Sequence, residues 1–230
     1  MWSLTELEIE AVELSLRVAT TAVIASLPFG ILVAWLLARR RFPGKALLNG
    51  LVHLPLILPP VVVGYLLLAI LGRNGPLGSW LFETFGITIA FTWKGAAVAA
   101  AVMAFPLMVR AIRLSMEAID PRIEQAAWTL GASPPWVFAT ITLPLALPGI
   151  LAGTILAFAR SLGEFGATIT FVSNIPGQTR TLPLALFSIV NTPGGEQGAL
   201  RLVVISIFLA MLALVASEVL ARRISARLRG

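Results

Sequence analysis

Five apolar stretches of about 20 residues each constrain this chain more than any other feature of its sequence. A bilayer core about 30 Å thick requires about 20 predominantly apolar residues at the helical rise of about 1.5 Å per residue. Hydrophobic residues make up 58% of the 230 residues and charged residues only 12%, unlike a soluble domain. We therefore predict an all-α integral membrane protein, a single domain over residues 1–230 with five transmembrane helices. The stretches cover residues 14–38, 48–71, 89–109, 141–161 and 202–220.

A sixth apolar segment, residues 181–190, is too short to cross the membrane. As a helix it would reach only about 15 Å. We expect it to form an interfacial or re-entrant piece.

Basic residues cluster on one side of the expected membrane. Because short cytoplasmic loops carry the excess of Lys and Arg, this side is predicted to be cytoplasmic. An odd number of spans then places the acidic N-terminus in the periplasm and the C-terminus in the cytoplasm. Contact with anionic lipid head groups accounts for these charges, so no nucleic acid partner is expected. Eleven of the 17 basic residues follow the first, third and fifth stretches: Arg39, Arg40, Arg41, Lys45, Arg110, Arg113, Arg122, Arg222, Arg223, Arg227 and Arg229.

Prolines interrupt the second stretch. Pro55, Pro59 and Pro60 each lack a backbone donor. Such residues kink or break a membrane helix unless neighbouring protein satisfies the freed carbonyl groups.

Small residues follow one face of the fourth stretch. Gly149, Gly153, Ala157 and Ser161 recur at every fourth position. Stripes of this kind let membrane helices approach closely, so tight packing is the first interpretation. A transport pathway along the stripe is the alternative.

Two charged residues lie near the outer end of the fourth stretch. Arg160 and Glu164 are four residues apart, which on a helix would place them on one face as an ion pair. Charges inside a membrane are costly and usually face a cavity or a partner. With Ser161, Thr168 and Thr170, the pair is predicted to line or gate a route for a hydrophilic solute. A purely structural ion pair is the alternative.

The segment at residues 117–140 is built like a small soluble helix-turn-helix between two apolar stretches. Asp120 before a proline is typical of a helix start, and Gly131 of a helix end. Ser133 with Pro134 repeats the start signal. The segment is therefore predicted to project into the cytoplasm as a docking element.

The same segment resembles a motif in permease subunits of bacterial ABC importers. That motif reads E-A-A, three residues, G, nine residues, then I-x-L-P. Gln125 stands where the glutamate is expected, and Glu124 lies one position early. The positions that match are Ala126, Ala127, Gly131, Ile141, Leu143 and Pro144.

Other motifs, including RRRFPGK, LPLILPPVVVGY and RSLGEFGATITF, resemble the molybdate-importer members of this family. The resemblance implies type I importer architecture in the bacterial inner membrane, with a homodimer of permeases, two ATP-binding subunits and a periplasmic oxyanion-binding protein. It also implies that the chain is not an enzyme and holds no cofactor, since ATP and Mg would be bound by the separate ATPase. The residues expected to couple to that ATPase are Glu124, Gln125, Ala126, Ala127, Leu130, Gly131, Ala132, Ser133 and Pro134.

Other functions fit the sequence less well. It has no G-x-x-x-x-G-K-[ST] loop for nucleotide phosphates. An ion-coupled secondary transporter commonly shows repeated halves, into which five spans do not divide. A membrane enzyme would need clustered acids, nucleophiles or metal ligands, whereas the chain has no cysteine and only His53. Sulfate, thiosulfate and tungstate remain alternatives to molybdate, because tetrahedral dianions differ only modestly in size.

Overall fold

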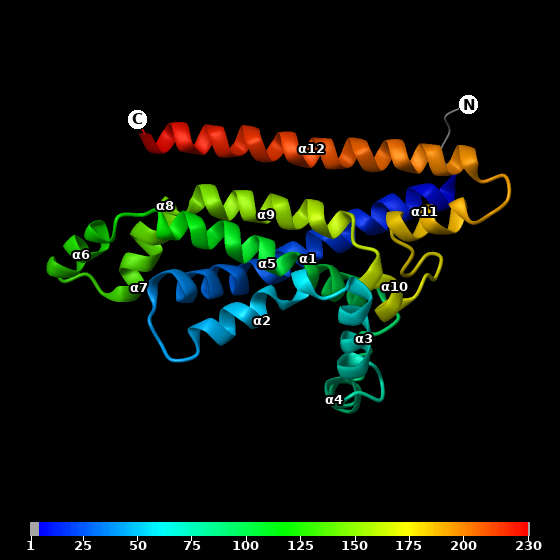
Figure 1. Cartoon of the computed structure of the whole chain (residues 1–230), viewed down its shortest axis with the longest axis horizontal. Helices are drawn as coiled ribbons and strands as arrows, with labels where there is room; N and C mark the ends of the chain where they lie inside the picture. The colour runs from blue at the N-terminus through cyan, green and yellow to red at the C-terminus, as the bar shows by residue number, and fades with distance from the viewer. Residues whose placement is uncertain (1–4, 230) are drawn as a thin grey trace.

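The computed structural model describes residues 5–229, without the side chains of residues 217, 218 and 220–229, and within that range it contains helices but no strand. Figure 1 shows the four longest helices running roughly side by side along the long axis of the molecule. Helix α5 contacts both α1 and α9, and α12 packs on α9. The all-α prediction is confirmed. These four helices are α1 (Glu6–Arg39), α5 (Trp93–Glu117), α9 (Leu147–Leu162) and α12 (Glu196–Arg229).

The number of membrane crossings lies between three and five by length and composition. Helices α1 and α5 and the part Glu196–Ala216 of α12 are each long and apolar enough to cross alone. Five crossings result if each of two bent helix pairs is one span. The five-span topology therefore stays a prediction.

Helix α1 begins at Glu6, eight residues before the first apolar stretch expected at residue 14. Thr5 and Glu8 form a capping box, in which Thr5 Oγ1 accepts from the Glu8 amide at 3.3 Å and the Glu8 carboxylate accepts from the Thr5 amide at 2.8 Å. The buried Glu8 carboxylate also pairs with Arg201 of α12, Nη2 to Oε1 at 2.8 Å. Because the two charges are paired, the Glu8 side chain is buried, while the other residues of this first turn are exposed.

The second apolar stretch is broken rather than continuous. Helix α2 (Lys45–Ile57) and helix α3 (Pro60–Leu71) meet at an angle of 115°. Pro59 and Pro60 cause the break, as the missing donors predicted, whereas Pro55 lies inside α2 without ending it.

Close packing holds α3 in its new direction. Gly64 of α3 lies against α10 (Gly166–Val172) so tightly that a Cβ there would be 2.5 Å from the Ala167 carbonyl oxygen. A side chain at this position would therefore force the two helices apart.

A short helix that the sequence did not predict follows α3. Helix α4 (Pro76–Phe85) has a proline at its first position and ends at Gly86, whose φ is +66°. With 10 residues it is too short to cross a membrane, so hydropathy alone does not indicate it. Figure 1 shows α3 and α4 projecting from the bundle.

The slim helix α5 forms the centre of the packing. Most of its alanines are buried between neighbouring helices. The small-residue stripe of α9 is also buried, with Gly149 in close contact with Ser115 and Gly153 beside the Met108 carbonyl oxygen. Packing is thus the role of these glycines. Helix α5 also continues to Glu117, beyond the expected end at residue 109.

The fourth stretch is bent as well. The helical segment Pro134–Leu145 meets α9 at an angle of 67°, so residues 141–161 are not one straight helix.

The sixth apolar segment forms a short helix, α11, of nine residues. The remaining elements are α6 (Pro121–Thr129), α7 (Pro134–Val137), the π-helix η1 (Phe138–Thr142), α8 (Leu143–Leu145) and α11 (Leu182–Val190).

Candidate functional site

The predicted docking segment lies at one end of the molecule. Figure 1 shows α6 and α7 projecting beyond α5 and α9, near the connection between α1 and α2 and on the same end as the end of α12. A cavity of about 750 Å³ lies between the docking segment and the α1–α2 connection, lined by Arg39, Arg40, Arg41 and Lys45. The structure thus gathers the predicted segment and the first basic cluster at one end. The side chains of Arg222, Arg223, Arg227 and Arg229 lie outside the described residues.

The corner of the docking segment has the geometry that its sequence predicted. Asp120 caps α6 by accepting from the Arg122 amide at 2.9 Å. Gly131 adopts a left-handed conformation with φ of +85° and donates to the Trp128 carbonyl at 3.0 Å. A Cβ added at Gly131 would meet nothing within 4 Å, so conformation rather than space favours glycine. Ser133 precedes α7 but makes no side-chain cap.

Large apolar side chains are exposed around this corner. Leu130 is 88% exposed, Trp136 55%, Trp128 48% and Ile123 46%. Exposed apolar patches mark sites of association with protein or membrane. The corner therefore offers a surface suited to a partner protein.

The predicted coupling residues divide into two faces. Glu124 and Ala127 are buried, and Ala132 is half-buried. The others are exposed, namely Gln125, Ala126, Leu130, Gly131, Ser133 and Pro134. Only the exposed group is available to a partner in this conformation.

The inward position of Glu124 was not foreseen. Its Oε1 accepts from Thr142 Oγ1 at 2.6 Å and lies 3.2 Å from Arg39 Nε. Both partners are far away in the sequence, so no local pattern could have identified them. The spacing of Glu124 and Ala127, three apart on α6, was the one available sign of an inward face.

The second predicted site surrounds the ion pair of Arg160 and Glu164. Nη1 of Arg160 lies 2.6 Å from Oε2 of Glu164, and their side chains are 29% and 2% exposed. The pair forms, but not on one helix face, because α9 ends at Leu162. Glu164 lies in the break that follows, where its Oε1 accepts from the Ala167 amide at 2.9 Å and holds the start of α10.

The hydroxyl residues of this site are mostly enclosed by the chain itself. Ser161 and Thr168 are buried, and Thr170 is half-buried with its hydroxyl donating to the Gly166 carbonyl at 2.9 Å. Among the described residues, Ser161 Oγ has no hydrogen-bond partner. The structure therefore brings the five predicted pathway residues into one region, and their part in a route stays a prediction.

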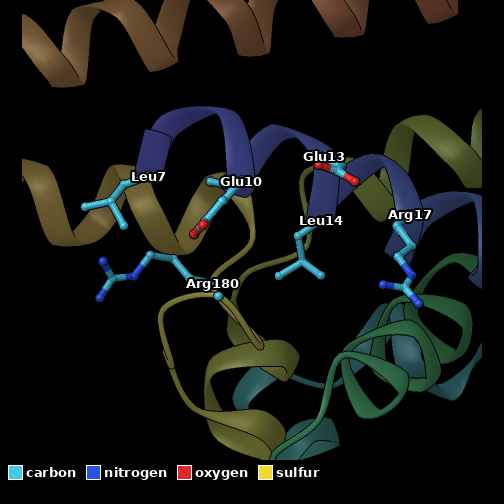
Figure 2. Close-up of a pocket in the computed structure, with 8 residues that line it drawn as sticks. Leu7, Glu10, Glu13, Leu14, Arg17 and Arg180 are labelled. Carbon is cyan, nitrogen blue, oxygen red and sulfur yellow. The ribbon is translucent and has the colours of Figure 1, made fainter. Parts of the chain in front are cut away.

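A separate pocket lies at the opposite end of α1. Figure 2 shows Arg17 and Arg180 at opposite ends of it, with Glu10 and Glu13 between them. The guanidinium of Arg17 stacks on Trp93, with Cζ 3.9 Å from the ring centroid. Two cations and two anions line the pocket, so their formal charges cancel.

Comparison with known proteins identifies relatives over nearly the whole chain. Residues 26–230 match the family described as "Binding-protein-dependent transport system inner membrane component". The Molybdenum transport system permease protein ModB of Escherichia coli (strain K12) is 66% identical over 219 residues, which cover 95% of this chain and 96% of that protein. The protein of the same name from Haemophilus influenzae is 59% identical over 222 residues, 96% of this chain and 97% of the relative.

Solved structures share the fold. An inward-facing structure of the MetNI methionine ABC transporter superposes with a TM-score of 0.74 at 17% identity, covering 96% of this chain and 99% of the compared chain. At this identity the likeness concerns the fold alone. It confirms the predicted importer-permease architecture.

Proposed function

The chain belongs to the family of inner membrane components of binding-protein-dependent transport systems, and from this we propose that it is the membrane-spanning permease subunit of an ATP-driven molybdate importer. The observation that carries the proposal is the 66% identity to a molybdenum transport permease over 95% of the chain. The two ModB relatives, from different bacteria, are both named for molybdenum transport. Molybdate is therefore a better candidate than sulfate, thiosulfate or tungstate.

The permease works as part of a larger assembly in this proposal. Two copies form the route through the membrane, two ATP-binding subunits dock beneath it, and a periplasmic protein delivers the oxyanion. ATP and Mg bind to the ATPase subunits, so this chain is a non-catalytic transport subunit. The exposed corner at Leu130 and Trp128 supports the docking step, because it offers apolar surface at the end of the molecule that carries the first basic cluster.

Arg160 and Glu164 contribute to the route in this proposal. Arg160 attracts the incoming dianion, and the paired carboxylate limits that attraction so that the anion is released. The 29% exposure of the Arg160 side chain supports the role, since part of the guanidinium is open to the surroundings.

Transport measurements test the anion. The permease, reconstituted in vesicles with its ATPase and the binding protein, is expected to accumulate radiolabelled molybdate in an ATP-dependent manner. Excess unlabelled sulfate should compete weakly, because delivery depends on the binding protein. Accumulation driven by an ion gradient without ATP would favour a secondary transporter, and stronger competition by sulfate than by unlabelled molybdate would favour a sulfate permease.

Cysteine labelling tests the orientation. The chain has no cysteine, so single introduced thiols report without background. A cysteine at the exposed Glu10 is expected to react with a membrane-impermeant maleimide from the periplasm, and one at the exposed Gln125 only after the membrane is opened. The reverse pattern would overturn the proposed orientation.

A further inference from the structure

We propose that Glu124 is a positioning residue that fastens the coupling helix α6 to two membrane-spanning segments, rather than a contact for the ATPase. This inference rests on the proposed function and deepens it. Glu124 is only 6% exposed, although it lies on a projecting helix whose neighbouring positions are exposed. The desolvation cost of burying a carboxylate is offset when the charge is paired and hydrogen-bonded.

One carboxylate oxygen joins three elements. Oε1 of Glu124, on α6, lies 3.2 Å from Nε of Arg39, the last residue of α1. The same oxygen accepts from Thr142 Oγ1 at 2.6 Å, and Thr142 is the last residue of η1, at the start of the fourth apolar stretch. The Glu124 side chain therefore links the coupling helix to the ends of both segments.

Arg39 closes the arrangement from the other side. Its Nη2 donates to the carbonyl oxygen of Ile119 at 3.1 Å, just before α6 begins. Arg39 therefore holds the chain on both sides of the Asp120 cap, through Ile119 and through Glu124. A turn of α6 about its own start would break at least one of these contacts.

Few other contacts hold α6 in place. Glu124 and Ala127 are its only buried residues among those described, and Ala127 has a single methyl group to pack. The large apolar side chains Ile123, Trp128 and Leu130 are exposed instead. The Glu124 contacts are consequently the main directional restraint between α6 and the bundle.

Helix geometry separates this role from that of the neighbouring position. Successive residues on a helix are rotated by about 100°, so Glu124 and Gln125 face different directions. Gln125, at the motif's glutamate position, is exposed and free to contact a partner. Glu124 instead carries the movement of α6 inward to Arg39 and Thr142.

Removing the charge should uncouple transport from ATP hydrolysis. In Glu124→Gln the amide oxygen can still accept from Thr142, but the attraction to Arg39 is lost. We expect the variant to co-purify with its ATPase and to hydrolyse ATP, while uptake per ATP hydrolysed falls about tenfold, as a coupling free energy of about 1.4 kcal/mol produces. The double variant Arg39→Gln with Glu124→Gln should lose only the hydrogen bond to the Ile119 carbonyl in addition, because the charge pair is already broken in the single variant.

A second buried ion pair supplies the matched control. Glu8→Gln removes the partner of Arg201 at the opposite end of α1, where the Glu8 side chain is 2% exposed. It should lower the amount of folded permease but leave uptake per ATP unchanged. Thr142→Val keeps the ion pair and should cause a smaller loss than Glu124→Gln.

The outcomes separate this inference from the proposed function. Loss of ATPase co-purification in Glu124→Gln would make Glu124 a contact residue and overturn the inference, as would an unchanged ratio of uptake to hydrolysis. An equal fall in that ratio for Glu8→Gln would show a general effect of lost stability and also overturn it. If the unaltered permease neither binds an ATPase nor transports, the proposed function itself fails.

Discussion

Replacing Gly131 by leucine is expected to abolish molybdate uptake while leaving the permease inserted in the membrane. At φ of +85° a side-chain-bearing residue costs about 1 kcal/mol or more, so the chain relaxes toward another corner conformation. The exposed residues Leu130 and Trp128 beside the corner then point in a different direction. Membrane fractionation, ATPase co-purification and uptake of labelled molybdate measure the three expected results: normal insertion, weaker association and no transport.

Two variants control for other causes. Gly131→Asn should retain most uptake, because asparagine tolerates the left-handed conformation better than leucine does. Gly86→Leu imposes similar strain at φ of +66°, also with nothing within 4 Å of the new Cβ, but on α4, far from the corner. It should leave ATPase association intact. Normal assembly and transport by Gly131→Leu would reduce the segment to a structured loop without a coupling role.

Replacing Arg160 by methionine is expected to cause the second large loss, in both folded protein and uptake. Glu164 has a side chain only 2% exposed, and removal of its partner leaves a buried charge unpaired. Breaking a buried pair in this way costs about 3–5 kcal/mol. Thermal unfolding of the purified permease should show a lower midpoint than the unaltered protein, and uptake should fall below detection.

The double variant distinguishes a structural pair from a functional one. In Arg160→Met with Glu164→Gln no buried charge is left, and the glutamine oxygen can still accept from the Ala167 amide. The unfolding midpoint should largely recover, while uptake should stay absent because the cationic group for the anion is gone. If uptake also recovered, the pair would serve only the fold, and the proposed pathway would need other residues.

The elements that the sequence predicted well are those determined by local physics. The corner at Gly131 and the cap at Asp120 depend on neighbouring backbone groups, so residue type alone specifies them. The break at Pro59 and Pro60 was foreseen for the same reason. Its angle of 115° was not, because close packing of Gly64 on α10, remote in the sequence, holds α3 in its direction.

The candidate site shows the same division. The pairing of Arg160 with Glu164 followed from their spacing, but the end of α9 at Leu162 did not, since the Glu164 carboxylate holds the next helix through the Ala167 amide. The inward face of Glu124 depends on Arg39 and Thr142, which only the folded chain brings to it. Contacts between remote segments are not visible in a single sequence.

The π-helix η1 between the coupling helices and the fourth span has a consequence for how this chain can change. A π turn holds one more residue than an α turn, so deleting one residue between Phe138 and Thr142 would restore an ordinary helix instead of interrupting it. Because the π turn absorbs the extra residue locally, the helical segments on either side of the deletion would keep their relative register. A single-codon deletion in η1 is therefore expected to be tolerated, whereas the same deletion inside the α-helix α9 would rotate the residues before it by about 100°.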